Sequence, residues 1–233
     1  MKKNRKRSPS RPRRSTVAPT VEPSPSAFLN RRRLLGGGIS LTGLIAGGYA
    51  LTRPGPDLGA PADDAVLEHV LGDRDSANRV VAYVSFTCVH CAVFHQTVWP
   101  WLKREYVDKS RISYTLREVA FDQYGLWAAS LARRAGPGRF YKVADLLLDS
   151  QRRWIHDDPE ETRRSLIAIG EQVGMPISLA EKAFTDIEAA DNLRQWIGRN
   201  VKRDGIDATP SFIVNGRRYG NMPQARFAEL LGA

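Results

Sequence analysis

The chain of 233 residues contains only two cysteines, Cys88 and Cys91, and two residues separate them. An apolar run over residues 79–86 precedes this Cys-x-x-Cys motif, and an amphipathic stretch of helical character follows from Ala92. A thiol at the start of a helix meets free backbone N–H groups and the positive end of the helix dipole, which favour its thiolate. The motif therefore predicts thiol–disulfide exchange, with Cys88 as the nucleophile and Cys91, one turn deeper, as the resolving thiol.

His90 lies between the two cysteines, and a protonated imidazole beside the thiolate would stabilise the reduced form further. A zinc site is the alternative, because four side chains in this segment are of zinc-binding types: Cys88, His90, Cys91 and His95. Zinc sites usually recruit a second pair of ligands from a distant part of the chain, and only His69 and His156 remain. We therefore favour a redox site without a metal, and we expect His95 to be a helix-surface or packing residue.

The net charge of +10 is concentrated at the N-terminus. Residues 1–33 hold eleven of the 35 Lys and Arg residues and a single acid, Glu22, so the remaining basic and acidic residues balance. A nucleic-acid-binding protein carries its positive charge on the folded domain, which argues against nucleic acid as a partner. The Ser, Pro and Arg content of residues 1–33 is typical of a disordered basic n-region of a leader.

Residues 34–52 form an apolar segment of the kind found in export signals and membrane anchors, and residues 34–51 carry no charge. The preceding residues, Asn30–Leu35, resemble a twin-arginine export signal. An ordinary secretory signal or an uncleaved anchor is the alternative. We therefore predict export to the periplasm or to the outer face of the inner membrane, with residues 53–64 as a linker rich in Pro, Gly and Asp.

The remaining residues, 65–233, are enough for one domain with a proper core. Two cysteines so close in sequence close too small a loop to stabilise such a domain, which supports a chemical role for them. The predicted strands are 66–71, 79–86, 112–120, 211–214 and 217–219. The predicted helices are 88–107 with a kink at Pro100, 124–135, 138–155, 159–173, 178–185, 187–203 and 223–231.

The order of these elements is β-α-β, a helical block, and then β-β-α. With the motif Tyr83-x-Ser-x-x-Cys88-x-x-Cys91-x-x-Phe94-His95, it resembles the DsbA-like thiol:disulfide oxidoreductases. Further matching segments are 116–118, 128–134 and 209–216. The resemblance implies an α/β thioredoxin fold whose core is 65–121 and 204–233, with an inserted helical subdomain at 122–203.

The resemblance also implies the working parts of the site. Cys88, Cys91 and His90 would be catalytic, and Thr209 and Pro210 would bind the substrate through a cis peptide bond that faces the cysteines. No cofactor is implied beyond the redox-active disulfide. The implied partners are cysteine-containing client proteins and a membrane redox partner that reoxidises the pair.

Two positions depart from the pattern of the family. Val89 stands where proline is common, and Ala82 stands where many relatives have an acid beneath the site. Glu118 is the nearest acid on the next strand, and we expect it to be a surface or salt-bridge residue. Proton transfer from Cys91 would then rely on water.

A monomeric dithiol oxidase is the favoured function. A disulfide isomerase or reductase is the first alternative, although isomerases of this superfamily dimerise through an added N-terminal domain. Only about 15 residues separate the apolar segment from the first predicted strand. A binding module for unfolded clients is the second alternative, and it would use apolar surface around Phe86, Phe94 and Phe212.

Overall fold

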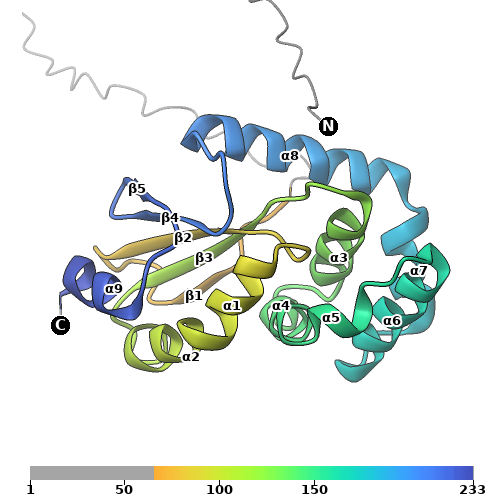
Figure 1. Cartoon of the computed structure of the whole chain (residues 1–233), viewed down its shortest axis with the longest axis horizontal. Coiled ribbons are helices and arrows are strands. Elements are labelled where there is room, and N and C mark those ends of the chain that lie inside the picture. Colours follow the sequence, from red (N-terminus) through yellow and green to blue (C-terminus); the bar gives the residue numbers. More distant parts are fainter. Residues whose placement is uncertain (1–65, 233) are drawn as a thin grey trace, which may run out of the picture. The chain divides into compact units, whose positions relative to one another are not determined.

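A mixed sheet of five strands in the order β1-β3-β2-β4-β5 organises the residues that the computed structural model describes, 66–232 (Figure 1). The predicted leader, apolar segment and linker over residues 1–64 lie outside the described residues. None of the helices between residues 66 and 232 is long and apolar enough to cross a membrane.

The central strands β2 (Arg79–Val84) and β3 (Ser113–Glu118) are parallel. Both are largely buried, which the near-continuous apolar run of residues 79–86 predicted for β2. The short strand β1 (Val70–Gly72) pairs with β3 in the antiparallel sense, and β4 (Ser211–Val214) pairs likewise with β2.

The last strand, β5 (Arg217–Tyr219), returns from β4 through the predicted two-residue turn. Asn215 and Gly216 both have positive φ angles, 49° and 80°. A type I′ hairpin turn requires this backbone conformation, which asparagine and glycine adopt at little cost.

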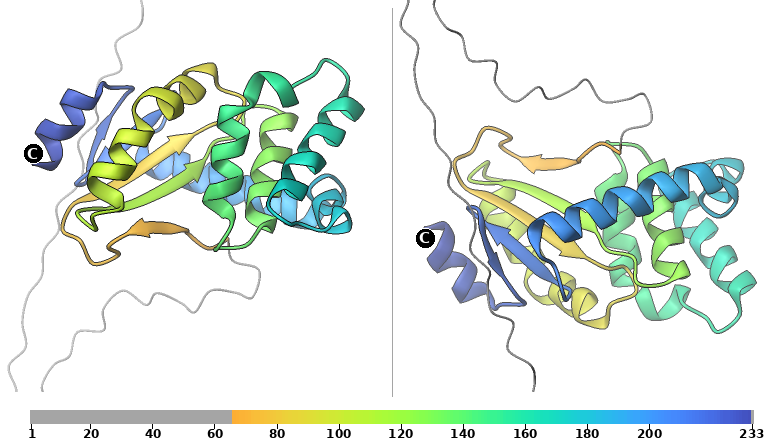
Figure 2. Two further views of the ribbon diagram at one scale, coloured as in Figure 1. Left: turned by 90° about the horizontal axis from the view of Figure 1, so that it is seen from below. Right: turned by 90° about the horizontal axis from the view of Figure 1, so that it is seen from above.

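Helices cover both faces of the sheet (Figure 2). On one face lie α1 (Val89–Thr97), α2 (Trp99–Leu102), the π-helical turn η1 (Lys103–Val107) and α9 (Gln224–Leu231). The long helix α8 (Ile187–Asp204) crosses the other face, where Tyr83, Val119 and Ile206 form a small separate cluster beneath it.

The helical block between β3 and β4 consists of α3 (Gln123–Arg134), α4 (Phe140–Asp149), α5 (Gln151–Trp154), α6 (Pro159–Gln172), α7 (Ile177–Thr185) and α8. Three of these helices begin at an aspartate whose carboxylate accepts a backbone N–H of the first turn. Asp122 caps α3, Asp158 caps α6 and Asp186 caps α8, with N–O distances of 2.7, 2.9 and 3.1 Å. The block shares one continuous hydrophobic cluster with the sheet and α1.

Two of the predicted helices are interrupted. The predicted helix 88–107 divides at Val98 into α1, α2 and η1, because Pro100 lacks an N–H and cannot continue the hydrogen-bond pattern of α1. The predicted helix 138–155 begins only at Phe140 and ends at Asp149, and a separate turn, α5, follows. At the break, the Ser150 hydroxyl donates to the Leu146 carbonyl at 2.6 Å, a bond that competes with helix continuation.

The strand boundaries also differ from the prediction. The first strand covers Val70–Gly72 rather than 66–71, and β2 ends at Val84 rather than at Phe86. The two residues after Val84 leave the sheet, because the chain turns there into the loop that carries Cys88 to the start of α1.

Candidate functional site

Cys88 occupies the N-cap position of α1, and Cys91 lies inside the first turn. The Cys88 carbonyl accepts the N–H groups of Cys91 and Ala92, both at 3.1 Å, so the helix begins directly at the first cysteine. Both cysteines are free thiols; Cys88 is half-buried, whereas Cys91 is fully buried. The structure therefore places the two thiols in the accessible and buried positions that the sequence predicted.

The environment separates the pKa values of the two thiols. A hydrogen bond from the Cys91 thiol lowers the pKa of Cys88 to about 5; burial opposes this, while the Thr209 side chain and the backbone N–H groups of Cys91 and His90 add to it. The pKa of Cys91 is raised far above its ordinary value, because its proton is held by the Cys88 sulfur and because the group is buried. Near neutral pH the pair is thus a Cys88 thiolate that accepts a hydrogen bond from a neutral Cys91.

The peptide bond between Thr209 and Pro210 is cis, as predicted. It brings Thr209 against the cysteines: the Thr209 carbonyl oxygen lies 3.3 Å from Cys88 Sγ and accepts its proton when the thiol is protonated. The Thr209 hydroxyl is buried and has no other hydrogen-bond partner among the described residues, so it is available to the thiolate.

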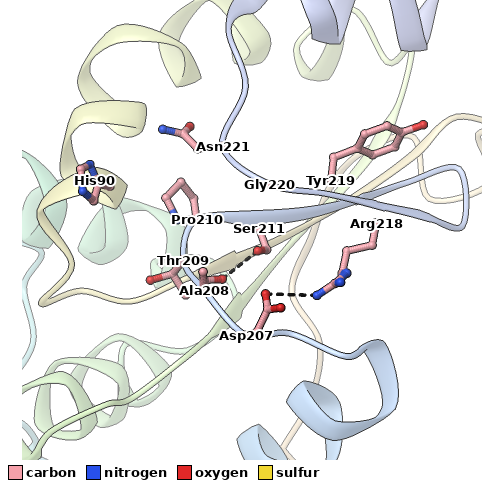
Figure 3. A pocket seen from close by; sticks show the side chains of 10 residues that line it. All are labelled: His90, Asp207, Ala208, Thr209, Pro210, Ser211, Arg218, Tyr219, Gly220 and Asn221. Carbon is pink, nitrogen blue, oxygen red and sulfur yellow. Dashed lines mark hydrogen bonds and ion pairs between the residues drawn. The ribbon is translucent and has the colours of Figure 1, made fainter. Parts of the chain in front are cut away.

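A groove of about 470 Å³ adjoins this loop, and we call it the cis-proline groove. Its lining residues are His90, Asp207–Ser211 and Arg218–Asn221 (Figure 3). The His90 side chain is exposed at one wall of the groove, and only its backbone N–H is among the groups that shift the pKa of Cys88. The catalytic role of the imidazole stays a prediction.

Two further residues, which the sequence did not point to, hold the loop before Cys88. The buried amide of Gln151 in α5 donates to the Phe86 carbonyl at 2.8 Å and to the Cys88 carbonyl at 3.0 Å. The Thr87 hydroxyl donates to Asp122 at 2.7 Å, the same carboxylate that caps α3. Asp122 was recognisable as a helix cap, but no local signal distinguished Gln151.

The strand beneath the site is apolar, as the departure at Ala82 implied. Ala82 is fully buried and pairs with Leu116 on one side and Phe212 on the other. Glu118 is not a surface residue: it is 1% exposed and forms a two-bond salt bridge to Arg133, with N–O distances of 2.5 and 2.6 Å. Its charge is neutralised there, and it is not among the groups that shift the pKa of Cys91.

His95 is a packing residue, as expected, and it is buried one turn beyond Cys91. Its Nε2 lies 3.4 Å from Asp145 and 3.6 Å from Asp149, and its ring stacks on Trp99. Between residues 66 and 232, no group of three or more His, Cys, Asp or Glu side chains is arranged to hold a metal ion.

The apolar surface expected for a client-binding module is not present at the predicted residues. Phe86, Phe94 and Phe212 are 1%, 3% and 0% exposed, and the last two pack against each other at a ring distance of 4.8 Å. These rings are part of the hydrophobic core and do not themselves provide that surface, so the client-binding module, which named the surface around them, stays a prediction.

A family model described as Thioredoxin matches residues 64–233. The "Putative protein-disulfide oxidoreductase" of Rickettsia felis is 34% identical over 153 residues, which are 65% of this chain and 54% of the relative. The protein of the same name in Rickettsia bellii is 35% identical and is covered to 58%. The chain thus spans little more than half the length of these curated relatives.

Among solved structures, Wolbachia pipientis α-DsbA1 matches with a TM-score of 0.65 at 21% identity, covering 70% of this chain and 88% of that protein. BdbD from Bacillus subtilis matches with a TM-score of 0.63, also at 21% identity, covering 70% and 90%. These similarities establish the fold, including the helical insertion between the two halves of the sheet. The chain therefore belongs to the thioredoxin family, in the DsbA-like form with inserted helices.

Proposed function

We propose that the protein is an exported thiol:disulfide oxidoreductase that works as a dithiol oxidase on client proteins. The observation that carries the proposal is the separation of the two thiols: Cys88 is accessible with its pKa lowered to about 5, and Cys91 is buried with its pKa raised. A thiolate that is stable near neutral pH is a good leaving group and a good nucleophile for exchange.

The reaction begins from the Cys88–Cys91 disulfide. A client thiolate attacks Cys88 Sγ, which forms a mixed disulfide, and Cys91 leaves as a thiolate and takes up a proton. A second client thiolate then attacks the client sulfur of the mixed disulfide and releases the Cys88 thiolate. The client loses two electrons and gains a disulfide, and the protein is left as the reduced dithiol.

The protein is expected to oxidise its client, and not to reduce it, because the reduced form of the protein is stabilised. Hydrogen bonds from Cys91, from Thr209 and from two backbone N–H groups stabilise the Cys88 thiolate. The thiolate forms only when the pair is reduced, so these hydrogen bonds stabilise the reduced form alone. Stabilising the reduced form makes the disulfide a stronger oxidant. The named disulfide oxidoreductases from Rickettsia support the same class of reaction.

Equilibration of the Cys88–Cys91 pair with a glutathione buffer tests the proposal. We expect a reduction potential nearer to the value of about −120 mV for DsbA than to about −270 mV for thioredoxin. A potential at the thioredoxin end would overturn the oxidase assignment and favour a reductase.

We also propose that a membrane redox partner reoxidises the protein and that the protein works as a monomer in the cell envelope. Export rests on the apolar segment 34–52, and the twin-arginine route rests on the sequence Asn30–Leu35 before it. Replacing Arg31 and Arg32 by lysine should leave the protein in the cytoplasm. Export that is unchanged in this variant would contradict the twin-arginine route.

A further inference from the structure

A second groove lies on the other side of the redox site, between α1 and α5, and we call it the α1–α5 groove. Its volume is about 370 Å³, and its lining includes the buried residues Ala92 and Gln151. Along α1 the groove is lined by Val89 and Val93, which are one helical turn apart and 54% and 47% exposed.

The opposite wall of this groove belongs to the end of α4 and to α5 and is lined by Asp149, Ser150, Arg152 and Arg153. Both arginines are exposed, and neither forms a salt bridge with another residue in the range 66–232. The one acid of this wall, Asp149, lies 3.6 Å from Nε2 of His95. The two guanidinium groups therefore outnumber the single carboxylate at this wall. The α1–α5 groove thus combines exposed aliphatic side chains with an excess of positive charge.

The two residues between the cysteines line different grooves. His90 lines the cis-proline groove, and Val89 lines the α1–α5 groove. In Figure 1, α1 lies between α9 and the β4–β5 hairpin on one side and α4 and α5 on the other. A polypeptide whose cysteine is bonded to Cys88 Sγ can therefore extend from the cis-proline groove into the α1–α5 groove.

We propose that the α1–α5 groove binds the client chain on one side of its reacting cysteine and favours segments that carry an aliphatic and an acidic residue. The aliphatic side chain would cover Val89 and Val93, and the carboxylate would pair with Arg152 and Arg153. The inference rests on the proposed function, because thiol exchange at Cys88 is what holds the client beside the groove.

Oxidation of three reduced dithiol peptides by the oxidised protein tests this binding. The peptides differ only in a flanking segment, Val-Asp-Glu, Val-Asn-Gln or Val-Lys-Lys, which is placed in turn before and after the cysteine pair. In one of the two placements we expect the acidic peptide to react about fivefold faster than the basic one, the size of effect that one or two exposed ion pairs produce. The variant Arg152→Glu/Arg153→Glu should reverse this ratio.

The matched control is Arg199→Glu/Lys202→Glu, which changes the net charge equally on α8, across the sheet from the site. It should keep the wild-type ratio, and comparing ratios within one variant cancels any change in the reactivity of the disulfide. Val93→Gln should slow the Val-containing acidic peptide but not a version with glycine in place of valine.

Equal rates for all peptides in the wild type, or a ratio that both double variants change alike, would overturn the proposed groove specificity. The groove would instead bind a second copy of the chain if the wild type sediments as a dimer and shows no peptide preference. In that case the Arg152→Glu/Arg153→Glu variant, and not the control, should be monomeric. If the oxidase function itself is wrong, the neutral peptide will also fail to be oxidised, which distinguishes the two failures.

Discussion

The two thiols of the site hold their protons in opposite ways, and this difference governs how the redox pair responds to pH. Above pH 5 the reduced pair keeps only the proton of Cys91, since the pKa of Cys88 is lowered to about 5 and that of Cys91 is raised. Because the pKa of Cys88 lies below its unfolded value of about 9, the reduced form gains stability as the pH rises from 5 to 9. It loses this stability again as the pH falls through 5.

The reduction potential should accordingly change slope near pH 5. Each proton taken up with two electrons changes the potential by about 30 mV per pH unit. We therefore expect a slope of about −30 mV per pH unit above pH 5, where only Cys91 takes up a proton, and about −60 mV per pH unit below it, where both thiols do. Equilibration with glutathione or dithiothreitol from pH 4 to pH 8 measures both limbs. A slope near −60 mV throughout that range would show that Cys88 is protonated in the reduced protein.

His90 contributes to the site through its backbone N–H, while its imidazole is exposed in the cis-proline groove. His90→Val keeps the N–H and removes the imidazole. If the imidazole stabilises the thiolate, the variant should have a higher Cys88 pKa and a potential lower by about 30 mV per pKa unit. Thiolate absorbance measures the pKa, and the glutathione equilibrium measures the potential. A potential within a few millivolts of the wild type would show that the His90 imidazole does not stabilise the Cys88 thiolate.

At the scale of elements, α5 holds the loop between β2 and α1 through one side chain. The variant Gln151→Met keeps the volume of this side chain but removes its hydrogen bonds to the carbonyls of Phe86 and Cys88. We expect a loss of about 1–3 kcal/mol in the free energy of unfolding. We also expect a higher pKa of Cys88, because its position at the helix N-terminus is no longer fixed.

The control for this variant is Gln172→Met, since Gln172 is exposed and its side chain bonds, among residues 66–232, only to Ala168 of its own helix. It should change neither quantity. A Gln151→Met variant that loses stability but titrates with the wild-type Cys88 pKa would show that the amide supports the fold without tuning the thiol.

The contact of α1 with α4 contains a histidine and an aspartate that together hold one proton near pH 5. Burial lowers the pKa of His95 to about 4 and raises the pKa of Asp145 to about 6. Near pH 5 the histidine binds one proton in the unfolded chain, and in the folded protein the buried pair also binds one proton. The two states bind equal numbers of protons, so the pair adds almost no pH dependence to stability between pH 4 and 6.

Single substitutions should reveal the two opposed contributions. Asp145→Asn leaves a histidine with a lowered pKa, so the free energy of unfolding should fall as the pH drops from 6.5 to 4. His95→Gln leaves an aspartate with a raised pKa, so the free energy of unfolding should rise as the pH drops from 6 to 4. Urea unfolding at several pH values measures both, and parallel profiles for the two variants and the wild type would contradict the shared proton.

At the scale of the whole molecule, the sequence predicted the features that depend on local signals. The strand β2 follows from its apolar run and the hairpin from Asn215-Gly216. The burial of Glu118 and the role of Gln151 were not predictable in this way. Their partners lie 15 and more than 60 residues away, and only the folded chain brings them together.

Arg133 connects three parts of the molecule that the sequence treats as separate. It pairs with Glu118 at the end of β3, and its guanidinium lies 5.2 Å from the ring centre of Phe140 in α4 and 4.5 Å from that of Trp196 in α8. The sheet, the insertion and the long helix therefore meet at one side chain. Because the side chain of Glu118 is fully buried, its charge depends on this contact.

Replacing Arg133 by methionine should leave Glu118 buried without a partner and cost about 3–5 kcal/mol in the free energy of unfolding. The double variant Glu118→Leu/Arg133→Met should lose much less, because it removes both charges and fills the space with apolar side chains. Arg194→Met is the control: its pairing with Asp191 is exposed and should contribute less than about 1 kcal/mol. Urea unfolding followed by tryptophan fluorescence measures all three, and a single variant no less stable than the control would mean that water reaches and solvates Glu118.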